Sequence, residues 1–138
     1  MKQRININSV VNETINEFGN VKVVCRLNNI LENLGLNLSE LADITGIRYA
    51  SLHELANNKK VTLNLQHTLA IMVALRVPSF DSLFEIQFED GEREAEYKEE
   101  VYQVHEAQQG LPDYVLNRRQ VNKQRVSEWK TEYKKTLE

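Results

Sequence analysis

Apolar residues recur every three or four positions along most of the chain, the spacing that puts them on one side of an α-helix. Residues 27–34 show it simply, with Leu27, Ile30, Leu31 and Leu34 followed by Gly35, a residue type that commonly ends helices. Five glycines and two prolines in 138 residues leave room for long helices. The pattern predicts an all-α fold with further helices at residues 9–18, 38–45, 48–57, 65–77, 80–84, 92–109 and 113–137.

Two short segments look like strands instead. Residues 21–25 (VKVVC) are mostly β-branched, and residues 85–88 (EIQF) alternate polar and apolar side chains. We therefore expect residues 21–25 to pair with 85–88 in a small two-stranded sheet. Such a sheet would tie together the two ends of the segment that lies between the strands.

Residues 38–57 have the residue types that two closely packed short helices require. Asn37 and Glu40 are spaced as a capping box. Ala42 is small enough for the helices to cross closely, and Gly46 accepts the left-handed conformation of a tight turn. Apolar residues that would hold the pair to a core are Leu41, Ile47, Leu52 and Leu55. This spacing predicts a helix-turn-helix, whose second helix enters the major groove of DNA while the first braces it.

The formal net charge of −3 is distributed unevenly. Residues 85–100 contain eight acidic and two basic residues, whereas residues 114–138 contain seven basic and three acidic ones. Because DNA phosphates select for basic surfaces, the net charge argues weakly against DNA binding. The uneven distribution weakens that objection, since the net charge of the whole chain says little about the charge of any one face.

The stretch from Val24 to Phe84 resembles the Cro/CI-like (xenobiotic-response-element, XRE) helix-turn-helix family of prokaryotic and phage transcriptional regulators. The residues that carry the resemblance are Gly35–Asn37, Glu40–Ala42, Thr45–Ile47, Leu52, Leu55–Lys59, Thr68–Leu69 and Ser82–Phe84. The resemblance implies a five-helix, lambda-repressor-like domain that binds double-stranded DNA, usually as a homodimer on a palindrome. The expected division is an N-terminal helical extension (1–20), the DNA-binding domain (21–90) and a C-terminal oligomerisation or partner-binding region (91–138).

By the same resemblance, residues 48–57 form the recognition helix. Arg48 would grip a guanine or a phosphate, while Tyr49 and His53 would read base edges or pack on a thymine methyl group. Each of these three is alternatively an ordinary surface residue. Glu54 would accept a hydrogen bond from a cytosine amine or repel the backbone. The residues expected at DNA are Arg48, Tyr49, Ala50, Ser51, His53, Glu54, Asn57, Asn58, Lys59 and Lys60, the last four at phosphates.

Two positions depart from the usual pattern of the family. Many members have a phosphate-clamping glutamine where this chain has Leu38, and a small hydroxyl residue caps the recognition helix where it has Arg48.

Residues 92–138 are expected to form a helical hairpin. Its apolar and aromatic residues are Tyr97, Val101, Val104, Val126, Trp129, Tyr133 and Leu137. Aromatic side chains on a stripe are costly to leave in water, so this surface is expected to be buried. Three uses remain open: dimerisation, packing against the rest of the same chain, and binding of a different protein, as in an antitoxin or a phage-encoded adaptor.

The sequence offers little support for other classes of function. It has no glycine-rich phosphate loop and no nucleophile-plus-base arrangement, so we expect no enzyme and no cofactor. His67 and His105 lack partners at metal-ligand spacing, so no metal site is expected. A single cysteine, Cys25, and the lack of a membrane-spanning run or signal peptide favour a cytoplasmic protein. The leading hypothesis is a dimeric DNA-binding repressor, and the alternative is a protein-interaction module that acts through its C-terminal helices.

Overall fold

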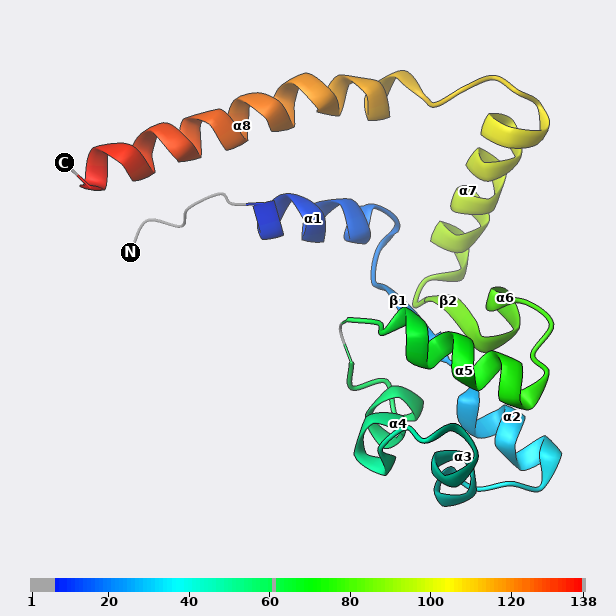
Figure 1. Cartoon of the computed structure of the whole chain (residues 1–138). Helices are drawn as coiled ribbons and strands as arrows, with labels where there is room; N and C mark the ends of the chain where they lie inside the picture. The colour runs from blue at the N-terminus through cyan, green and yellow to red at the C-terminus, as the bar shows by residue number, and fades with distance from the viewer. Residues whose placement is uncertain (1–6, 61, 138) are drawn as a thin grey trace. The chain divides into compact units, whose positions relative to one another are not determined.

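The computed structural model describes residues 7–60 and 62–137, which fall into two compact units (Figure 1). Residues 22–87 form the first, here called the central unit. The described parts of residues 1–21 and 88–138 form the second, the terminal unit, so the segments flanking the central unit on both sides belong together. The described chain is predominantly helical, as the spacing of apolar residues predicts.

The described residues of the central unit form five helices framed by two strands. In chain order these are β1 (Val21–Cys25), α2 (Leu27–Leu34), α3 (Leu38–Thr45), α4 (Tyr49–Ala56), α5 (Leu65–Leu75), α6 (Phe80–Leu83) and β2 (Phe84–Phe88). The strands pair in an antiparallel sheet. The backbone N–H of Arg26 donates to the Leu83 carbonyl at 2.7 Å beside the strand ends. The predicted five-helix domain and its small sheet are both confirmed.

The core of the central unit draws one large aliphatic side chain from each of its helices. Leu27, Leu41, Leu52, Ile71 and Leu83 are all less than 2% exposed. Burying each contributes about 1.5–3 kcal/mol relative to leaving it in water. Because the five side chains meet in one cluster, α3 and α4 are fixed in place by the surrounding helices.

Two predicted helices end earlier than expected. Residue 77 precedes a proline and is therefore biased away from helical geometry. α5 accordingly ends at Leu75, with Arg76 in the left-handed region at φ 55°, rather than at Pro78. The helix predicted at 92–109 is α7 (Gly91–Val101) followed by a π-helical turn (Tyr102–Glu106), so residues 107–109 are not helical.

The terminal unit combines a helix before the central unit with two after it. α1 (Ile7–Ile15) continues into a 3-10 turn (Asn16–Phe18), and α8 (Asp113–Leu137) follows α7. The ring of Tyr97 on α7 lies 5.3 Å from that of Phe18 and 5.3 Å from that of Phe88. This aromatic cluster joins α7 to the turn after α1.

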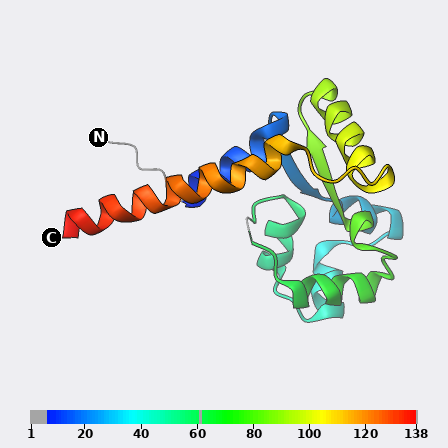
Figure 2. The ribbon, with the colours of Figure 1, turned by 90° about the horizontal axis from the view of Figure 1, so that it is seen from above.

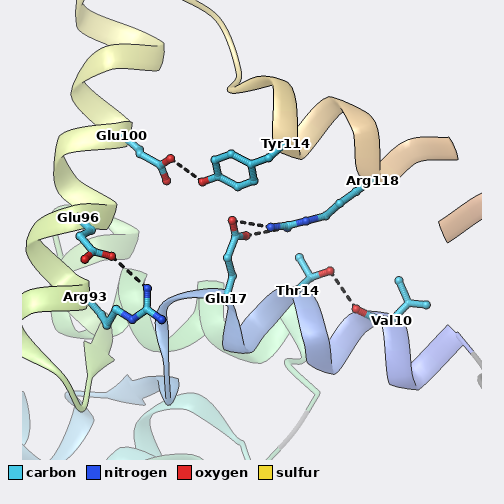
Figure 3. Close-up of polar contacts among 8 residues, drawn as sticks. All are labelled: Val10, Thr14, Glu17, Arg93, Glu96, Glu100, Tyr114 and Arg118. Atoms are coloured by element: carbon cyan, nitrogen blue, oxygen red, sulfur yellow. Dashed lines mark hydrogen bonds and ion pairs between the residues drawn. The ribbon is translucent and has the colours of Figure 1, made fainter. Parts of the chain in front are cut away.

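α1 and α8 run alongside each other in opposite directions in both views (Figure 1, Figure 2). Glu17 pairs with Arg118, and Glu13 pairs with Arg125, each with a shortest N–O distance of 2.7 Å. The first pair is drawn in Figure 3, beside the Tyr114 hydroxyl that donates to Glu100. Of the six half-buried residues described on α8, five repeat at intervals of three and four and include both arginines that pair with α1, which defines the face toward α1: Val115, Arg118, Asn122, Arg125 and Trp129.

Acid should weaken the contact between α1 and α8. Hydrogen bonds from Arg125 and Arg118 hold the pKa values of Glu13 and Glu17 below their ordinary value. Carboxyls with lowered folded pKa values stabilise fully above the unfolded pKa, about 4.3 for glutamate, and this contribution is lost as pH falls through the folded pKa. Trp129, the only tryptophan, lies on the face of α8 toward α1. Its fluorescence should therefore change below about pH 4.3.

The matched variant carries Glu13→Gln and Glu17→Gln. Its Trp129 emission at neutral pH should resemble that of the acidified wild-type protein and then vary little as the pH falls. If Trp129 fluorescence of the variant and of the wild-type protein depends on pH in the same way, these two carboxyls do not cause the change at low pH.

Candidate nucleic-acid interface

α3 begins at a complete capping box. The Asn37 side-chain oxygen accepts from the Glu40 N–H at 2.8 Å, and Glu40 Oε1 accepts from the Asn37 N–H at 3.2 Å. These bonds satisfy two backbone donors that have no partner inside the helix. The start of the first helix of the motif, predicted from the spacing of Asn37 and Glu40, is thus confirmed.

The turn between α3 and α4 is held by a glycine and a threonine. Gly46 has φ 78°, a conformation that costs other residues about 1–2 kcal/mol, and its N–H donates to the Ala42 carbonyl at 2.8 Å. The Thr45 hydroxyl donates to the Leu41 carbonyl at 2.8 Å and accepts from the Ile47 N–H at 3.2 Å. The predicted role of Gly46 is confirmed. The role of Thr45 was missed, although a threonine beside a turn glycine is a recognisable sign of such bonding.

α4 separates a buried side from an exposed one. Leu52 is 1% exposed and Ala56 4% exposed, and both face the core. The exposed side chains predicted to meet DNA are Arg48, Tyr49, Ala50, His53, Glu54 and Asn57. Arg48 is the N-cap residue, and its guanidinium makes no hydrogen bond or ion pair with another described residue, so it is available to a ligand. Ser51 is half-buried and lies over the core beside Leu52, so it presents less surface than the sequence suggested.

The exposed side of α4 carries an aromatic pair and a partly balanced acid. The rings of Tyr49 and His53, one helical turn apart, lie 6.0 Å from each other. Lys60 Nζ lies 4.0 Å from a Glu54 carboxylate oxygen. A nearby cation offsets part of the repulsion that Glu54 would exert on phosphates. Lys59 is exposed in the same segment.

Asn58 makes a structural hydrogen bond, and its predicted contact with the phosphate backbone stays a prediction. It adopts φ 60° after α4, and its Oδ1 accepts from the N–H of the buried Cys25 at 2.7 Å. The bond links the end of α4 to β1. Its neighbour Asn57 instead donates to the His53 carbonyl at 2.8 Å, within its own helix end.

Substitutions of Asn58 should separate the contribution of its hydrogen bond to Cys25 from that of its left-handed backbone conformation. Asn58→Gly keeps the backbone conformation but leaves the Cys25 N–H without its partner, which should cost about 1–3 kcal/mol. Asn58→Ala adds the strain of positive φ and should cost about 1–2 kcal/mol more. Urea unfolding of both variants measures this, with Asn57→Ala as the control. Equal stability of Asn58→Ala and Asn57→Ala would contradict a role for the Cys25 bond.

The aromatic and apolar residues predicted for a tail interface lie in different surroundings. Tyr97 is 37% exposed and packs on Phe18 and Phe88, while Val101 and Tyr133 are 40% and 46% exposed. Val104, Val126 and Trp129 are half-buried, and the Trp129 and Tyr133 rings stack at 5.9 Å. The side chain of Leu137 lies outside the described residues. The interface itself stays a prediction.

The described residues contain few features of other kinds of site. They include no cluster of three or more His, Cys, Asp or Glu residues that would hold a metal ion. The Cys25 thiol is buried, and burial raises its pKa, which disfavours the reactive thiolate. In the part of the chain that the structure describes, no helix is long and apolar enough to cross a membrane.

A capped α3, a left-handed glycine turn and an α4 with one buried and one exposed side together define a helix-turn-helix. Residues 26–89 match the family model of the Cro/C1-type HTH DNA-binding domain. The resemblance noted over Val24–Phe84 is therefore confirmed, and the protein carries a DNA-binding domain. No curated protein and no solved structure matches the chain.

Proposed function

We propose that the protein is a sequence-specific transcriptional regulator that binds a palindromic operator as a homodimer and acts as a repressor. The observation that carries the proposal is the separation on α4: Leu52 and Ala56 are buried, while Arg48, Tyr49 and His53 lie exposed on the helix. A helix anchored in this way can enter the major groove without loss of its own packing.

The exposed groups of α4 match the chemistry of base edges. A free guanidinium such as that of Arg48 donates to the two acceptors of guanine or to a phosphate. The rings of Tyr49 and His53 supply flat apolar surface and polar edges for thymine methyl groups and base acceptors. Lys59 and Lys60, immediately after the helix, are suited to phosphates.

Exposed apolar side chains in both units support assembly of a dimer. In the terminal unit Val101 and Tyr133 are 40% and 46% exposed. On α5 the side chains of Leu65, Leu69 and Val73, spaced four residues apart, are 71%, 61% and 56% exposed. Apolar side chains in such a row are more stable against a second copy than in water.

Selection of bound sequences from random duplex DNA tests the proposal. We expect enrichment of an inverted repeat with half-sites about one helical turn, roughly 34 Å, apart. A parallel selection with His53→Ala should relax base preference at one position in each half-site, because a good base contact contributes about 1–3 kcal/mol of discrimination. Recovery of random sequences would overturn the proposal of sequence specificity, and recovery of single half-sites would overturn the dimer.

A further inference from the structure

We propose that α8 is a second DNA-binding element, in which a row of four cations binds the phosphates of duplex DNA without regard to base sequence. The row, here called the cationic stripe, consists of Arg119, Lys123, Lys130 and Lys134. The inference extends the proposed function but does not depend on recognition of an operator.

The stripe occupies one side of α8. At 100° per residue, its four members fall within an arc of about 60° and span about 22 Å of helix. All four are exposed, and none of their side chains makes a hydrogen bond or ion pair with another described residue. The acidic residues Glu128 and Glu132 lie on the opposite side of the helix.

The remaining contacts of α8 fix which side is free. Arg118 and Arg125 are paired with Glu17 and Glu13, and they lie on the face toward α1. These two cations are therefore already neutralised and unavailable to phosphates. The stripe begins about a quarter of a turn away from that face, so its side chains remain in solvent while α8 is held by α1.

Charge distribution favours DNA as the occupant. The central unit, residues 22–87, contains six basic and six acidic residues, whereas α8 contains seven basic and three acidic ones. Binding to duplex DNA draws much of its free energy from cations that displace counterions at phosphates. The central unit, which contains the helix-turn-helix, has no net positive charge, whereas α8 has more basic than acidic residues.

The composition of α8 disfavours a membrane surface. A helix that lies in a membrane interface needs a continuous apolar face opposite its cations. On α8 the side opposite the stripe includes Asn117, Gln124, Glu128 and Glu132. Phosphates on a water-exposed duplex fit such a helix better than the boundary of a lipid layer.

The test measures binding of the full chain to a short random-sequence duplex at several salt concentrations. The stripe variant is Lys123→Gln with Lys130→Gln. The control, Lys22→Gln with Lys135→Gln, removes the same charge from exposed positions outside the stripe. Loss of two phosphate contacts should reduce the slope of log K against log[salt] by about 1.8 and weaken binding roughly 10–100-fold near 0.1 M salt. The control should leave both nearly unchanged.

Other outcomes of these experiments distinguish DNA binding by the cationic stripe from its alternatives. Equal effects of both variants would mean that net charge alone governs binding, and no effect of either would mean that the stripe is merely solvated. A change in self-association with unchanged DNA binding would assign the stripe to the acidic α7 of a second copy. Failure of the selection experiment with a normal stripe effect would overturn the proposed operator recognition and leave this inference standing. Circular dichroism and Trp129 emission of both variants should match the wild-type protein, since all four substituted residues are exposed.

Discussion

Leu41→Ala should lower the free energy of unfolding of the central unit by about 2–5 kcal/mol, the range for truncating a buried leucine. The side chain of Leu41 is 0% exposed and projects from α3 into the cluster that joins all five helices. The lost atoms leave a cavity that rigid neighbours fill only in part. Since domains of this size are stable by about 5–15 kcal/mol, the variant should be close to its folding threshold.

Urea unfolding followed by far-ultraviolet circular dichroism measures the loss. Leu34→Ala is the matched control, because the same atoms are removed from a side chain on α2 that is 52% exposed. It should change stability by less than about 0.5 kcal/mol. Trp129 lies in the terminal unit, so its fluorescence reports the other unit of the same sample. Equal losses for Leu41→Ala and Leu34→Ala would contradict the described core.

Ala50→Glu should abolish DNA binding while the fold is retained. Ala50 is exposed at the second position of α4, and the first turn of that helix contains no acidic residue. A carboxylate there interacts favourably with the helix dipole, by about 0.3–1 kcal/mol. Against DNA the same charge meets phosphates, and like charges brought together across an interface cost several kcal/mol. We expect affinity to fall at least about 100-fold.

Asn29→Glu is the control for Ala50→Glu. It adds the same charge to an exposed position in the first turn of α2, which also lacks an acidic residue. Fluorescence anisotropy with a labelled operator, at one fixed salt concentration, should show little change for the control. If both variants lose affinity equally, repulsion by overall charge rather than contact through α4 explains the loss. Unchanged affinity of Ala50→Glu would exclude α4 as the reading helix.

Local sequence pattern predicted most of the central unit because its elements are set by neighbouring residues. The capping box of Asn37 and Glu40 and the left-handed Gly46 act within a few positions of themselves. The pairing of residues 21–25 with 85–88 was also predictable, since each strand had its own composition. Pro78 predicted the end of α5 only approximately, because the helix already ends at Leu75.

Contacts between distant residues were not predictable in the same way. The bond from Cys25 to Asn58 and the pairs of Glu13 and Glu17 with α8 join segments whose proximity depends on tertiary folding. Nothing in the spacing of Asn58 distinguishes a phosphate ligand from an anchor for a strand. For α4, the spacing of apolar residues predicted which side is exposed. The half-buried position of Ser51 could not be predicted in this way, because it depends on how neighbouring elements pack around α4.

The ion pairs between α1 and α8 link two segments of the terminal unit that lie on either side of the central unit in the chain. Glu13 and Glu17 precede the central unit in the chain, and their partners Arg125 and Arg118 follow it. After a protease cut in the segment between α7 and α8, only noncovalent contacts, among them these ion pairs with a helix about a hundred residues earlier, would hold α8 in place. The same dependence makes a tag or fusion at one terminus a perturbation of the other. A substitution in α1 or in α8 would act on a surface that both helices share.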